Sequence, residues 1–178
     1  MIVGLVAPSG TGKTVVAKRL KKRHGFARIH AGAPLKRAFR AGFGLTKAEV
    51  SGDSRIDEPA RAMGGVAPRP AMDAAAAAIH AKAPHATAVQ LGRALDRKAA
   101  KGRDVVVDGV RSPHEAEAIR RRGGVIVRVS RPGISADPEL AMDRLQQGIA
   151  ADHQIEHPGT KKGLRAEADK LAMRLVKP

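Results

Sequence analysis

The chain of 178 residues contains no cysteine, no tryptophan and no tyrosine, and aromatic residues make up only 2% of it. The absence of cysteine excludes disulfide bonds, cysteine-based zinc sites and thiol catalysis. The core must be built from Ala, Val, Leu and Ile, with Phe26, Phe39 and Phe43 as its only large rings. Proteins that grip single-stranded nucleic acid usually stack bases on aromatic side chains, which this chain can hardly supply.

Long apolar runs are also missing. The apolar N-terminal run, residues 1–7, is too short for a membrane span or a signal-peptide core, and no basic region precedes it. We therefore interpret it as a first strand and expect a soluble, cytoplasmic protein with no membrane partner.

Charge of one sign dominates the chain. It has 33 Lys and Arg against 17 Asp and Glu, a formal net charge of +16. Such a surface attracts polyanions such as nucleotides, nucleic acid or acidic lipid. We favour a solvated cationic surface that suits anionic substrates, and nucleic acid stays an alternative partner.

Short apolar runs alternate with longer helical patterns, which predicts an α/β fold with a parallel sheet and crossover helices. The length fits a single domain over residues 1–178. Glycines and prolines interrupt residues 44–71, which we interpret as an acceptor-binding insertion or a plain connector. The predicted strands are 2–7, 26–30, 104–108, 125–129 and 153–156, and the predicted helices are 13–24, 34–43, 71–81, 86–101, 113–122, 138–147 and 162–176.

The chemistry is clearest at residues 7–14, Ala-Pro-Ser-Gly-Thr-Gly-Lys-Thr, which match G-x-x-x-x-G-K-[ST] except for Ala7. Its glycines let successive backbone N–H groups point at phosphate oxygens, and the following helix adds its positive end. Ala7 fits if its φ angle is negative. We expect ATP to bind to this loop and the Thr14 hydroxyl to be one of the ligands of Mg²⁺. The predicted nucleotide-binding residues here are Ser9, Gly10, Thr11, Gly12, Lys13, Thr14 and Val15.

A second candidate site follows the strand predicted at residues 104–108. Asp108 ends this strand, where ligands gather in open parallel sheets, and we expect it to hold magnesium or to orient the acceptor. Arg111 follows as a candidate phosphate clamp, since a planar guanidinium suits phosphate. Two alternatives remain open: Asp108 could be a helix-capping or ion-paired acid, and Arg111 could be a surface arginine that pairs with Glu115. Lys13, Asp108 and Arg111 are the predicted catalytic residues.

Several short motifs occur in a familiar order along the chain. They are Ala33-Pro34-Leu35-Lys36, Gly64-Gly65 with Pro68-Arg69, Asp108 to Glu115, and Gly123-Gly124 with Val125 to Arg131. Together with the phosphate loop they resemble the phage-type deoxynucleoside monophosphate kinases of the P-loop nucleoside monophosphate kinase superfamily. Residues 151–160 are also similar to the end of dephospho-CoA kinases. The usual Asp-Val-Arg of the family is Gly109-Val110-Arg111 here, with the acid one residue earlier.

The resemblance implies a three-layer sandwich, with a five-stranded parallel sheet between helices and a lid, which we place at residues 131–147. It implies acceptor binding by Lys36, Arg69 and Arg111, and nucleotide binding by Arg131 just past a strand. Residues 44–71 would then be an insertion on the acceptor side.

The hypothesis that follows is an ATP- and magnesium-dependent kinase, monomeric or homodimeric, that converts (deoxy)nucleoside monophosphates to diphosphates. One alternative keeps the fold and changes the acceptor to dephospho-CoA or another small molecule. The other is a non-catalytic, nucleotide-dependent protein that binds nucleic acid.

Overall fold

In the computed structural model, residues 1–51, 55–136 and 141–176 are described. They form two compact units, one of residues Met1–Ala31 and Ala88–Pro178 and the other of Gly32–Thr87. The first unit contains the sheet, and the second contains the segment that the sequence predicts as an insertion.

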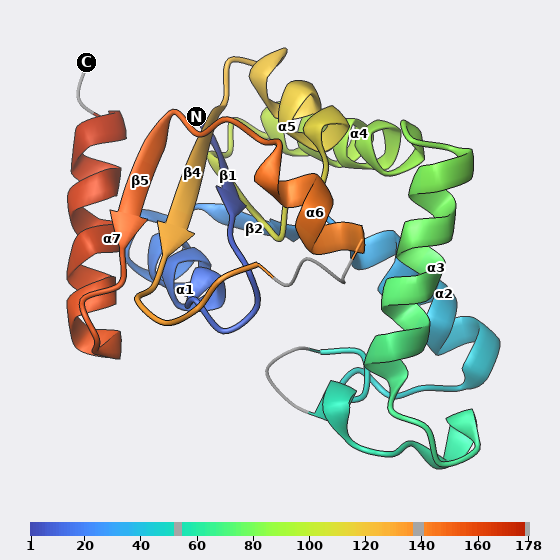
Figure 1. Cartoon of the computed structure of the whole chain (residues 1–178). Helices are drawn as coiled ribbons and strands as arrows, with labels where there is room; N and C mark the ends of the chain where they lie inside the picture. Colours follow the sequence, from blue (N-terminus) through green and yellow to red (C-terminus); the bar gives the residue numbers. More distant parts are fainter. Residues whose placement is uncertain (52–54, 137–140, 177–178) are drawn as a thin grey trace. The chain divides into compact units, whose positions relative to one another are not determined.

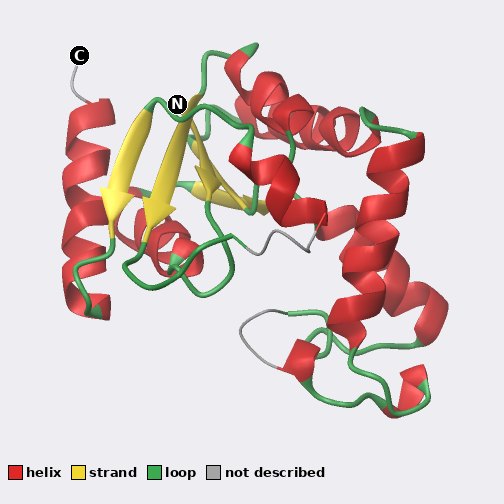
Figure 2. Ribbon diagram, in the orientation of Figure 1, coloured by secondary structure: helices red, strands yellow, loops and turns green. Residues whose placement is uncertain are grey.

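The first unit is built on a five-stranded sheet in the order β2-β3-β1-β4-β5, with every neighbouring pair parallel (Figures 1 and 2). The central strands are nearly continuous β-branched runs because both of their faces are covered. Leu5 and His30 both align with Asp108 in register, so three strands end close together. The strands are β1 (Ile2–Val6), β2 (Ala27–His30), β3 (Val105–Asp108), β4 (Val125–Ser130) and β5 (His153–Glu156).

Helices cover both faces of this sheet. Helices α1 (Lys13–His24) and α7 (Lys161–Val176) pack together and bury Val16, Leu20 and Leu164 against it. On the other face, α4 (Ala86–Ala99) and α5 (Pro113–Arg120) contribute Leu95 and Ile119 to a second core cluster. The predicted fold class, an α/β sandwich around a five-stranded parallel sheet, is confirmed.

Most element boundaries agree with the predictions to within one or two residues, and β5 agrees at both ends. Helix α3 (Pro68–Lys82) begins three residues earlier than predicted, because Pro68 occupies its first turn, where a missing N–H costs nothing. Helix α6 is Ala141–Gln147, and residues 137–140 of the predicted lid lie outside the described residues.

The second unit has a small core of its own. Helices α2 (Ala33–Phe43) and α3, with two short 3₁₀ turns at Arg55–Asp57 and Arg61–Met63, enclose Phe39, Ile56 and Met72. The expectation that all three phenylalanines are core residues is wrong for Phe43, which is 50% exposed at the end of α2 and only touches the Phe39 ring. Residues 52–54 of the predicted insertion lie outside the described residues.

Within the described ranges, no helix combines the length and the apolar character that crossing a bilayer requires.

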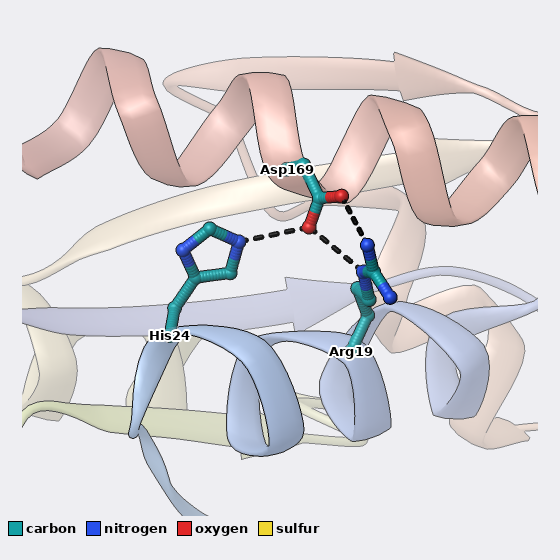
Figure 3. A network of polar contacts seen from close by, with 3 residues as sticks. All are labelled: Arg19, His24 and Asp169. Atoms are coloured by element: carbon teal, nitrogen blue, oxygen red, sulfur yellow. Dashed lines mark hydrogen bonds and ion pairs between the residues drawn. The ribbon is translucent and has the colours of Figure 1, made fainter.

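An ion-pair network joins α1 to α7 (Figure 3). Arg19 donates to both carboxylate oxygens of Asp169, at 2.8 and 2.6 Å, and His24 lies 2.8 Å from the same group. The hydrogen bonds from Arg19, together with His24, lower the pKa of Asp169 from 3.8 to about 2. This contact ties the helix that begins at the phosphate loop to the last helix of the chain.

Because the folded-state pKa of Asp169 lies below its unfolded value, its stabilisation is present at neutral pH and is lost as the pH falls from 3.8 through 2. We expect Asp169→Asn to lower the free energy of unfolding by about 1 kcal/mol at pH 7. Urea unfolding should show that this difference is constant above about pH 5 and shrinks below about pH 4.

Glu167→Gln is the matched control. Glu167 lies on the same helix and makes a single ion pair with Lys170, at 2.8 Å and three residues away. This variant should change the unfolding free energy by less than about 0.5 kcal/mol. Equal effects of the two substitutions would contradict a special role for the Asp169 network.

Candidate functional site

The phosphate loop connects β1 to α1 through two glycines in the left-handed region. Gly10 has φ +81° and Gly12 has φ +98°. Among the described residues only glycines have positive φ, so Ala7 adopts an ordinary backbone conformation. Ala7 is fully buried in the core. The alanine at the first motif position therefore fits its place, as the sequence predicts.

Gly12 is also required by close packing. A Cβ added there would collide with Leu164 of α7 and would lie 3.2 Å from Cδ2 of His157. His157 is 6% exposed, and its Nδ1 accepts the backbone N–H of Gly159 at 3.0 Å. The segment after β5 and the start of α7 thus pack against the loop at Gly12. No sequence motif indicated this role of His157.

Lys13 opens α1 and its ammonium group lies inside the curve of the loop. It donates to the carbonyl of Pro8 at 2.8 Å and to that of Ala7. Burial lowers the pKa of Lys13 to about 8, the charge of Arg111 acts in the same direction, and Asp108 and Asp143 oppose it. Lys13 thus lies within electrostatic reach of two acids and one arginine.

The other predicted loop residues differ in what their side chains do. Ser9 is exposed, and Val15 packs partly buried against the core while its N–H donates to the Gly12 carbonyl at 2.8 Å. Thr11 is fully buried, and its hydroxyl donates to the Pro8 carbonyl at 2.9 Å. The Thr11 side chain therefore shapes the loop and is not available to a ligand.

Asp108 lies at the end of β3 beside the loop. Its side chain is 3% exposed, and the Thr14 hydroxyl lies 3.5 Å from its Oδ2 atom. Arg28 of β2 donates to the same oxygen through Nε at 3.1 Å and through Nη2. The structure thus brings together Lys13, Thr14 and Asp108, as the sequence predicts, and adds Arg28.

Arg111 follows three residues after Asp108, just before α5. Its backbone N–H donates to the Glu115 carboxylate at 2.8 Å, while the Ser112 hydroxyl accepts the Glu115 N–H at 3.2 Å and caps the helix. Glu115 is 3% exposed, so it serves this helix start. The Arg111 side chain is half-buried and close enough to Lys13 for its charge to affect the lysine.

The segment after β4 lies over the loop. The Arg131 guanidinium donates to the Gly10 carbonyl at 3.3 Å, and a Cβ added at Gly10 would lie 3.2 Å from the Ile134 side chain. Arg131, predicted at the nucleotide, is therefore placed at the phosphate loop, and Ile134 is an additional neighbour.

The predicted acceptor residues Lys36 and Arg69 belong to the second unit. Lys36 is half-buried in the first turn of α2. Arg69, in the first turn of α3, pairs with both carboxylate oxygens of Asp57, one of them at 2.9 Å. Hydrogen bonding from Arg69 lowers the pKa of Asp57.

Three residues of this region were missed by sequence reasoning: Arg28, Asp143 and His157. In the sequence, Arg28 is a single charged residue within a short strand, and Asp143 is a single acidic residue on a polar helix. Asp143 lies in the first turn of α6 and acts on Lys13 through its charge. The one available signal was a basic residue inside a short, half-buried strand, since a cation that is partly removed from water needs an acidic partner.

The donors at the site fit a hard cation. No cluster of three or more His, Cys, Asp or Glu suited to a metal occurs in the described part of the chain. One hydroxyl and one carboxylate, at Thr14 and Asp108, match the way Mg²⁺ is held in nucleotide sites, where phosphate oxygens and water supply the remaining ligands.

Comparison with solved structures identifies the fold. The sheet and its helices are similar to a sugar kinase from Janibacter sp. HTCC2649, with a TM-score of 0.54, 12% identity, and 96% of this chain and 92% of that chain covered. Shikimate kinase from Aquifex aeolicus gives a TM-score of 0.54 at 13% identity, with coverages of 98% and 96%. Shikimate kinase from Acinetobacter baumannii gives 0.50 at 16%, with coverages of 98% and 92%.

At the level of sequence, a search of curated proteins found no match. A family model described as "AAA domain" matches residues 3–168, a range that contains both the phosphate loop and Asp108. Since this match spans most of the chain, the chain belongs to the AAA domain family.

Proposed function

We propose that this protein is an ATP- and magnesium-dependent kinase that transfers a phosphoryl group to a (deoxy)nucleoside monophosphate and releases the two diphosphates. The observation that carries the proposal is the approach of Thr14 to the buried Asp108 carboxylate at 3.5 Å, beside Lys13. Phosphoryl transfer requires positioning and charge stabilisation more than covalent chemistry, and this arrangement supplies both.

In this proposal the loop from Ser9 to Val15 binds the ATP phosphates through its backbone N–H groups and the start of α1. Lys13 leaves the carbonyls of Ala7 and Pro8 and binds the outer phosphates. Arg131, already at Gly10, adds positive charge on the same side. Thr14 and Asp108 hold Mg²⁺, which when bound neutralises charge on the β- and γ-phosphates.

The acceptor reaction is a displacement at the γ-phosphorus. A phosphate oxygen of the acceptor forms the new bond to phosphorus, while the bond to the bridging oxygen of ADP breaks. Arg111 binds the acceptor phosphate, and its charge effect on Lys13 supports a place near the transferred group. The ordered motifs around Lys36 and Arg69 support a role in acceptor binding for each of them.

A second candidate keeps the donor site and changes the acceptor. The names of the structurally similar proteins include a sugar kinase and shikimate kinases. The acceptor would then be a small hydroxylated molecule, such as dephospho-CoA or a sugar, and the attacking oxygen would be a hydroxyl.

The experiment that tests the proposal is an assay of ADP release against ribo- and deoxyribonucleoside monophosphates, dephospho-CoA, shikimate and simple sugars. We expect turnover only with monophosphates and only when Mg²⁺ is present. Turnover confined to a hydroxyl acceptor would favour the second candidate, and no acceptor-stimulated release at all would contradict both.

Lys13→Ala should reduce turnover by about 10²-fold or more, because it removes charge stabilisation from the transferring phosphoryl group. Steady-state kinetics and thermal unfolding of the same preparation separate this loss from a folding defect. The control is Lys21→Ala, an exposed lysine two turns further along α1, which should retain full activity. Near-normal turnover of the Lys13 variant would refute the assignment of the phosphate loop.

Arg111→Ala should raise KM for the acceptor by about 10- to 100-fold and leave KM for ATP unchanged, because a charged hydrogen bond contributes about 1.5–3 kcal/mol. Arg121→Ala is the matched control. Arg121 directly follows α5, is exposed, and pairs with Glu117 of that helix. A change in KM for ATP alone would place Arg111 on the donor side.

A further inference from the structure

Arg28 is an arginine on the edge strand β2 whose guanidinium group lies at the candidate site. Its backbone aligns with Val106, two residues before Asp108 on β3. Alternate residues of a strand point to the same face, so Arg28 and Asp108 share one face of the sheet. The arginine extends along that face and binds the carboxylate at the strand end.

The contact is directed at one oxygen atom. Nε of Arg28 donates to Oδ2 of Asp108 at 3.1 Å and Nη2 donates to the same atom. The Thr14 hydroxyl lies 3.5 Å from this oxygen as well. The two groups converge on Oδ2 from β2 and from α1, and together they fix the rotation of the carboxylate.

Burial explains why such a partner is required. The Asp108 side chain is 3% exposed, and an ionised carboxylate removed from water is retained only when it is paired and hydrogen-bonded. The guanidinium group of arginine is always charged, planar and rigid, so it orients the carboxylate as well as neutralising its charge. Lys13 is a second cation whose charge interacts with that of Asp108, and in the proposed function it turns to the phosphates.

We propose that Arg28 is a positioning residue that holds the Asp108 carboxylate beside Thr14 and thereby determines how strongly a divalent cation strengthens nucleotide binding. The inference rests on the proposed function, in which Thr14 and Asp108 hold Mg²⁺. Partners that orient a metal-binding side chain commonly change metal affinity 10- to 100-fold when they are removed.

The test is calorimetric titration with a non-hydrolysable ATP analogue, once in EDTA and once in Mg²⁺. The readout is the dissociation constant measured in EDTA divided by the one measured in Mg²⁺, so a high ratio means that Mg²⁺ strengthens binding of the analogue. This measurement requires no turnover. Asp108→Asn should reduce this ratio, and Arg28→Gln should reduce it by about tenfold or more. Arg128→Gln is the matched control, because Arg128 of β4 donates to the Ile149 carbonyl and has no contact with Asp108. It should retain the wild-type ratio.

Two further variants protect the test against a folding defect in Arg28→Gln, which leaves a buried charge without its partner. The double variant Arg28→Gln/Asp108→Asn lacks that charge and should give the same ratio as Asp108→Asn alone. Arg28→Lys keeps the charge and loses the planar guanidinium group, and its ratio should lie between those of the wild type and Arg28→Gln.

The outcomes separate the two proposals. A wild-type or higher ratio in Arg28→Gln, alongside a reduced ratio in Asp108→Asn, would overturn the role of Arg28 and leave the metal role of Asp108 intact. A further reduction in the double variant would also overturn it, because Arg28 would then act independently of Asp108. A wild-type ratio in Asp108→Asn, or no effect of Mg²⁺ on the wild type, would reject the magnesium site of the proposed function and the inference with it.

Discussion

A carboxylate that is almost completely shielded from water lies at the end of β3, and positively charged side chains lie close to it. Asp108 is paired with Arg28 and lies within electrostatic reach of Lys13. The strand order makes this possible, because β3 lies between β2 and β1 and all three end at the same edge. The parallel register brings the acid to the arginine and to the phosphate loop, although the sequence separates Asp108 from Arg28 by 80 residues and from Thr14 by 94.

The phosphate loop is held in place by segments from the other end of the chain. Gly12 leaves room for Leu164 and His157, and Gly10 lies against Ile134. Arg19 and His24, further along the same helix, pair with Asp169 of α7. The phosphate loop is local in sequence, but its shape depends on packing against His157, which follows β5, and against α7, which packs on α1 (Figure 1). A rigid support of this kind keeps backbone N–H groups in position for phosphate.

Much of the fold could be predicted from the sequence, and the reasons are visible in particular residues. The unbroken run Val105–Val107 suits only a strand that is covered on both faces, and the glycines before Lys13 have no other common use than a tight anion-binding turn. Phe43 was predicted wrongly, because an aromatic residue at a helix end is buried only if another element covers it. The resemblance to deoxynucleoside monophosphate kinases remains a prediction about the acceptor, whereas the P-loop kinase fold is confirmed.

By itself, the sequence determined the α/β architecture, the phosphate loop and the placement of Asp108 at a strand end, because these follow from periodicity and from residue spacing within short segments. Only the tertiary structure decided which groups surround Asp108 and Gly12. Nothing local to Arg28 or His157 identifies its partner, since their contacts depend on strand order and on packing between segments distant in the chain. Long-range pairing of this kind is fixed by the whole core, and no short motif encodes it.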